Sequence, residues 1–149
     1  NLGSSEESNG NVQVGLNASY EDKQDAFGNS IQSSFEGTQT LLGSDLRYTN
    51  SGFLLSGEFI YSWLESDTGS EFNPNGYYVT AGYYVTPKTQ LLVRWDDFRG
   101  DNLGSDASSV IAGINIFPSA YSEIQLNYSI PTEQAIDYSQ LLLNLQLNF

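Results

Sequence analysis

The sequence predicts an all-β fold: an antiparallel, up-and-down transmembrane β-barrel to which this chain contributes eight strands. Apolar and polar residues alternate with a period of two over most of the 149 residues, which is typical of strands and not of helices. The alternating segments are about nine to twelve residues long, which is the length that a tilted strand needs to cross a bilayer. The links between them are alternately short and long, as in outer-membrane barrels.

The alternation is clearest in the last segment, where leucines occupy every odd position from Leu141 to Leu147. Residues 1–11 are polar and are expected to form a flexible leader, with 12–149 as barrel strands and no second domain. Traced along the chain, the pattern predicts strands near 12–20, 38–48, 53–64, 76–86, 89–98, 109–117, 123–130 and 141–149.

The links differ in length and composition. Short turns are expected at 49–52, 86–88 and 118–120. The longer links are rich in Gly, Asn, Ser and Asp, and lie near 21–37, 65–75, 99–108 and 131–136. An even number of antiparallel strands places both ends of the chain on the short-turn side.

The alternation alone does not tell whether the apolar face meets lipid or a protein core, as in a soluble lipocalin-like barrel. Lipid is favoured because the polar face is mostly Gly, Ser, Thr, Asn and Gln, whereas a soluble surface carries many charges. Aromatic residues also gather near the strand ends, as expected where rings meet the two membrane interfaces. The expected girdles are Tyr20, Tyr61, Trp63, Tyr77, Trp95 and Phe98 on the long-loop side, and Tyr48, Phe53, Tyr83, Tyr121 and Phe149 on the short-turn side.

Few charged residues fall within the strands, and six of them are expected on the polar face. In a wide barrel they would line the pore and tune its ion selectivity. In a narrow eight-stranded barrel, whose interior holds only side chains, they would instead form a salt-bridged network. The six residues are Asp45, Arg47, Glu58, Arg94, Asp96 and Glu123.

The composition argues against enzyme activity. The chain has no His and no Cys, so it lacks the usual nucleophile pairs, imidazole acid–base groups, thiolate metal sites and disulfides. Five Lys and Arg stand against eighteen Asp and Glu, for a net charge of −13. Nucleic-acid binding requires a basic surface, so no nucleic-acid partner is expected.

Acidic residues gather in the long links. Their carboxylates are hard oxygen donors, but their spacing matches no dedicated calcium loop. We expect solvated acidic loops that hold divalent cations loosely at most, and no cofactor. These residues are Glu21, Asp22, Asp25, Glu65, Asp67, Glu71, Asp97, Asp101, Asp106, Glu133 and Asp137.

The segment YYVTAGYYVTPKTQLLVRWDDFRG (77–100) resembles the late strands of outer-membrane porins of the phosphate-selective porin O and P type. Residues 94–98 are similar to that family's Arg-Tyr-Asp-x-Phe pattern, and IQLNYSIP followed by LLLNLQLNF resembles its final hairpin. Those barrels have about twice as many strands, so the chain is similar to a carboxy-terminal half. The family's anion preference rests on basic lumen residues, of which this face offers little beyond Arg47 and Arg94.

The resemblance implies a location in the bacterial outer membrane, with periplasmic termini and contacts with lipid and lipopolysaccharide. It also implies that Phe149 is the assembly signal read by the barrel-assembly machinery. The expected function is porin-like passive diffusion of small solutes and ions, leaning towards cations. A second copy in a homo-oligomer, another chain or a missing amino-terminal half would then complete the barrel, because eight strands alone leave no channel. The alternative is a small closed eight-stranded barrel with a structural or surface-interaction role through its acidic extracellular loops.

Overall fold

The computed structural model describes residues 10–23, 37–101, 106–133 and 138–147. These residues form nine strands and no α-helix. The expected all-β, antiparallel fold is therefore confirmed. The strands are β1 (Asn11–Lys23), β2 (Gly37–Asn50), β3 (Phe53–Ser66), β4 (Glu71–Phe72), β5 (Asn75–Thr86), β6 (Thr89–Arg99), β7 (Ala107–Ser119), β8 (Ser122–Pro131) and β9 (Gln140–Leu147).

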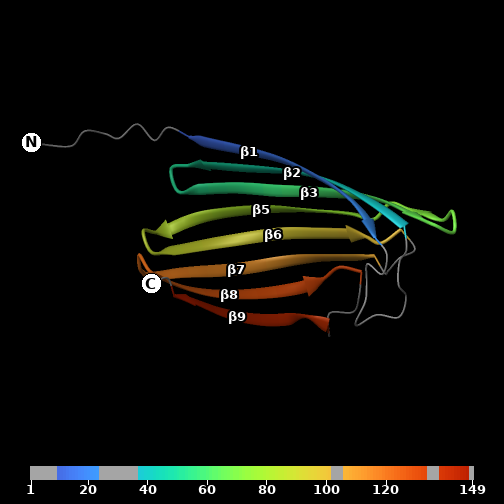
Figure 1. The fold of residues 1–149 in the computed structure, drawn as a ribbon. Coiled ribbons are helices and arrows are strands. Elements are labelled where there is room, and N and C mark those ends of the chain that lie inside the picture. Colours follow the sequence, from blue (N-terminus) through green and yellow to red (C-terminus); the bar gives the residue numbers. More distant parts are fainter. Residues whose placement is uncertain (1–9, 24–36, 102–105, 134–137, 148–149) are drawn as a thin grey trace, which may run out of the picture.

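All nine strands belong to one sheet, in the order β1-β2-β3-β5-β6-β7-β8-β9, with β4 paired to β3. Every neighbouring pair is antiparallel. Figure 1 shows the long strands side by side in a single layer, with tight turns at one end and the longer links at the other. The chain thus runs up and down through neighbouring strands, as its alternating link lengths predict.

The ninth strand is the short β4, which lies inside the link expected at 65–75. Glu71 pairs with Glu65, and Phe72 with Leu64, so the link folds back onto the end of β3. Two residues are too few to show an alternation, which is why the sequence pattern predicts eight strands.

The turn between β2 and β3 has a local cause. Ser51 and Gly52 both have positive φ, 48° and 83°. Positive φ at both central residues defines the type I′ turn, whose twist matches the twist of the two strands it joins. Asn50 and Phe53 close this hairpin as the last paired residues.

The first strands are longer than their apolar patterns. Pairing of β1 with β2 continues past Tyr20 to Glu21↔Gln39 and Lys23↔Gly37. Backbone hydrogen bonding therefore extends into polar sequence at the long-link end, because the ladder depends on main-chain groups and not on hydropathy.

The sheet is open. Within the described residues β1 pairs only with β2, and β9 only with β8. The alternative of a small barrel closed by this chain alone is therefore not the observed arrangement. The described part of the chain also lacks a hydrophobic core: Leu64, 4% exposed, is its one buried apolar side chain. One face of the sheet is largely apolar, and the other is largely polar but also carries apolar side chains such as Leu41 and Leu92.

Candidate functional site

The register places all six residues of the predicted charged set on the same, polar face. Asp45 pairs with Glu58, Glu58 with Tyr78, and Tyr78 with Asp96. Paired residues in a sheet point to the same side, so three carboxylates and one tyrosine form a row across β2, β3, β5 and β6. This row places an acidic band near the middle of the polar face.

Arg94 is anchored beside this row. Its Nε donates a hydrogen bond to Asp96 Oδ1 over 2.7 Å, and its Nη2 lies 2.7 Å from the same oxygen. Its guanidinium carbon also lies 3.8 Å from the centroid of the Tyr78 ring, in cation–π geometry. The Arg94 charge is therefore held in place and offsets one of the three carboxylates.

Arg47 and Glu123 share the polar face but lie apart from this cluster. Arg47 pairs in register with Gln13 and Ser56, and forms no ion pair within the described residues. Glu123 lies near the turn before β8 and accepts a hydrogen bond of 2.8 Å from Gln125 Nε2. The six residues therefore do not form one continuous salt-bridged network.

The polar face is hollowed into a trough of about 1130 Å³. The trough is lined by side chains of strands on both sides of the middle of the sheet, from Gln39 and Leu41 on β2 across to Gln140 on β9. One concavity that spans these strands identifies the polar face as the concave side. Glu58, which belongs to the acidic row, lies in the wall of this trough.

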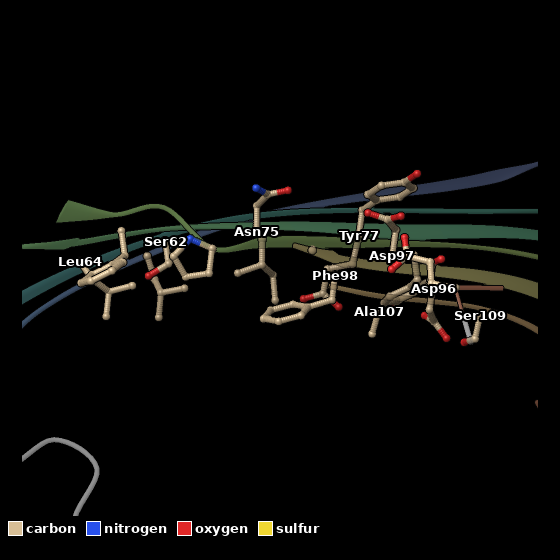
Figure 2. A pocket seen from close by; sticks show the side chains of 18 of the residues that line it. Ser62, Leu64, Asn75, Tyr77, Asp96, Asp97, Phe98, Ala107 and Ser109 are labelled. Atoms are coloured by element: carbon tan, nitrogen blue, oxygen red, sulfur yellow. The ribbon is translucent and has the colours of Figure 1, made fainter. Parts of the chain in front are cut away.

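Phe98 corrects one of the sequence-based assignments. It was expected among the lipid-facing girdle residues, but it pairs with Gly76 and lies two residues from Asp96, on the concave face. Figure 2 shows Phe98 and Asp96 directed to the opposite side of the sheet from Tyr77. The alternation Leu91-Val93-Trp95 assigns odd positions of β6 to the convex face, so an even position points into the trough.

Glycines on the concave face provide space for polar neighbours. A Cβ added to Gly15 would lie 2.1 Å from Asp45 Oδ1, and one added to Gly113 would lie 2.3 Å from Asn127 Oδ1. Gly43 stands in the same relation to Asn17. These polar side chains therefore lie over the neighbouring strand, which is consistent with glycine relieving crowding on this face.

The convex face is apolar and exposed, with Leu16 at 82%. Within the strands, the register places Tyr20, Tyr48, Tyr77 and Trp95 on this face, whereas Tyr121 lies in the turn before β8. Phe53 and Tyr83 pair across β3 and β5 at the short-turn end, and the ring centroids of Tyr61 and Trp63 lie 4.4 Å apart near the other end, with the rings tilted by 55°. Phe149 lies outside the described residues. The exposed aromatic residues of this face are Tyr20, Phe53, Phe59, Trp63, Tyr77, Tyr83, Trp95 and Tyr128.

Sequence reasoning missed an ion-pair cluster at the long-link end. Arg99 binds Asp97 through two hydrogen bonds of 3.0 and 2.9 Å, and its Nη1 lies 3.2 Å from Asp106 and 3.0 Å from Glu133. The cluster joins β6, the start of β7 and the end of β8. The spacing of Asp97 and Arg99, two apart on a strand, is the one signal that the sequence offered.

Asp106 receives a second donor in this cluster, because the Gly100 amide donates to its Oδ1 over 3.0 Å. This backbone hydrogen bond, together with the bond from Arg99, holds the pKa of the Asp106 carboxyl below its usual value. Asp101 accepts a further hydrogen bond from the amide of Asn73. The Asp101 carboxylate thus joins the link after β6 to the link after β3.

Within the ranges that the structure describes, no group of three His, Cys, Asp or Glu side chains is arranged to hold a metal ion, and the carboxylates that do converge surround Arg99. Asp25 and Asp137 lie outside those ranges. The described residues include no helix long and apolar enough to cross a membrane. No family model, curated protein or solved structure matches the chain.

Proposed function

We propose that this chain supplies the strands of an outer-membrane β-barrel whose concave face lines a water-filled passage for small solutes and ions. The observation that carries the proposal is the single-layered sheet with an exposed apolar face. Soluble domains cover such a face with a second layer. Each large apolar side chain left in water forgoes roughly 2 kcal/mol of burial free energy, so a whole face of them requires an apolar environment.

The charge distribution on the convex face supports lipid as that environment. In the described residues the register assigns five charged residues to this face: Asp22, Glu65, Glu71, Asp97 and Arg99. All five lie at the long-link end of the sheet. Between those ends and the short turns the face carries no charge, as a bilayer core requires. A protein partner would impose no such band.

The charges of the concave face favour cations. Asp45, Glu58, Asp96 and Glu123 outnumber Arg47 and Arg94, and Asp96 is already paired with Arg94. Carboxylates along a passage raise the local concentration of cations and repel anions within about 8 Å at physiological salt. We therefore propose passive, cation-leaning diffusion and no phosphate selectivity.

Single-channel recording tests the proposal directly. The chain, extracted in mild detergent and added to a planar lipid bilayer, is expected to give discrete current steps. A salt gradient is expected to give a reversal potential that favours cations, and Glu58→Gln is expected to move it towards zero. Silence from a sample with a confirmed β-sheet spectrum would contradict the proposal.

A further inference from the structure

We propose that the open sheet is completed by a second copy of this chain, with β1 of each copy paired to β9 of the other. The inference deepens the proposed function and rests on it, because it names the partner that closes the passage. Four features of the sheet support it: the direction of its outer strands, the stagger of its register, the chemistry of its edges and the separation of the walls of its trough.

The strand directions permit this closure. The path from β1 to β9 contains eight strands, and each runs antiparallel to the next. β1 and β9 therefore run in opposite directions, and a two-fold rotation sets β9 of one copy antiparallel to β1 of the other. A symmetric pair of copies uses the same two edges twice and leaves none unpaired.

The register gives the expected alignment. A line of paired residues starts at Val12, one residue into β1, and reaches Leu141, six residues before β9 ends at Leu147. The strands are thus staggered by five residues over seven steps, the shear that a tilted barrel requires. One more step of this slope, with the apolar faces kept together, sets Leu16 of one copy opposite Leu143 of the other, with Leu141 as the next alignment.

The two edges have complementary chemistry. Residues 11–20 of β1 and 140–147 of β9 contain no charged residue and no proline. Strands that remain at a sheet edge are usually protected by such residues. Both edges also carry the same alternation, with Leu16 and Leu143 on the convex face and Asn17 and Asn144 on the concave face. Pairing the edges would therefore continue both faces without interruption.

The concave face favours a wide barrel. Within the described residues, the backbone of each strand approaches only its neighbours in the sheet, so the walls of the trough are not packed against each other. In a barrel of eight strands the interior is filled by side chains, whereas sixteen strands enclose an aqueous channel. Two copies supply sixteen long strands and convert the trough into a passage.

Cysteine cross-linking tests the pairing, because the chain has no native Cys. The double variants Leu16→Cys/Leu143→Cys and Leu16→Cys/Leu141→Cys cover the two expected alignments. After insertion into lipid vesicles and mild oxidation, at least one is expected to give a covalent dimer on a non-reducing gel. The matched control is Leu16→Cys/Leu126→Cys, whose second residue lies on the convex face of β8, away from the edge. It is expected to give none.

The mass of the unmodified chain in detergent supplies a second readout that needs no substitution. Two copies per particle are expected. A single copy per particle, or a disulfide formed within one chain, would overturn the inference. Channel currents from a single-copy particle would leave the proposed function standing and remove this inference. Cross-linked pairs that give no current would support the pairing of β1 with β9 and contradict the proposed function.

Discussion

The guanidinium carbon of Arg94 lies over the ring of Tyr78, 3.8 Å from its centroid, and Arg94 Nε and Nη2 both contact one carboxylate oxygen of Asp96. Aromatic face and carboxylate together fix one positive charge on the wall of the trough. The charge is still accessible, because the Arg94 side chain is 37% exposed. Its removal should therefore affect both the local field and the nearest carboxylate.

Replacement of Arg94 by Gln is expected to strengthen cation preference. The change removes one positive charge and releases Asp96 from its ion pair. Reversal potentials across planar bilayers under a salt gradient would measure the effect. Arg47→Gln is the matched control, since Arg47 has the same charge on the same face but no ion pair among the described residues. An anion-shifted Arg94→Gln channel would contradict the assignment of this face to the passage.

Neighbouring positions on β6 separate a lipid-facing surface from a water-facing one. Val93 lies on the convex face, 51% exposed, whereas Leu92 lies on the concave face. Val93→Arg is expected to cost about 2–4 kcal/mol of folding free energy in a bilayer, whereas an arginine that faces the lumen costs far less. Denaturant titration of folding into lipid vesicles would measure the folding free energies of Val93→Arg and of the matched variant Leu92→Arg. Equal tolerance of the two arginines would show that the convex face does not meet lipid.

Gly37 is predicted to be sensitive to substitution. Its φ is 146°, and a Cβ at this position would lie 2.1 Å from the backbone oxygen of Glu65. A backbone atom cannot move aside as a side chain can, so Gly37→Ala is expected to destabilise the sheet by roughly 1–3 kcal/mol. Gly82→Ala is the matched control, since its nearest contact would be Gln90 Nε2 at 3.2 Å. We expect a change below about 1 kcal/mol there. Thermal or denaturant unfolding would compare the two.

The Arg99 cluster is expected to respond to acid. The folded-state pKa of Asp106 lies below its unfolded value, so the stabilisation is present above the unfolded pKa, about 3.9. It is lost as the pH falls through the lower folded value. Proteolysis of the link between β6 and β7 by an acid-active protease is expected to accelerate over that range. In Asp106→Asn, this link should be cleaved faster than in the unmodified chain at pH 6, and the cleavage rate should change less on acidification. An unchanged pH profile in this variant would contradict the role of Asp106.

Neither Arg99→Ala nor Arg99→Lys is expected to preserve the ion-pair cluster at the end of β6. Its planar guanidinium reaches both oxygens of Asp97 while also contacting Asp106 and Glu133. A lysine ammonium cannot reproduce two parallel hydrogen bonds from one fork. Both variants should therefore show faster exchange of the Gly100 amide in hydrogen-exchange measurements. Full protection in Arg99→Lys would indicate that charge alone holds the link.

The strands could be predicted from the sequence because a two-residue period leaves a regular trace along each one. Glu58 and Asp96 were assigned to one face on that basis, and the register brings them into one row with Tyr78. Phe98 stands at an even position of β6, so the register places it on the concave face, although an aromatic residue at a strand end is typical of a girdle. The contact of Arg99 with Glu133, thirty-four residues away, depends on which strands are neighbours. No local pattern contains that information.

The sheet order also determines how the molecule can assemble. Each long strand follows its neighbour along the chain, so hairpins can be added one at a time, and each addition closes only a short loop at a small entropic cost. All these steps are unimolecular. The union of β1 with β9 of another copy would be the single bimolecular event. Dilution should therefore slow only the last stage of assembly, the association of two copies, which follows the formation of the strands within each copy.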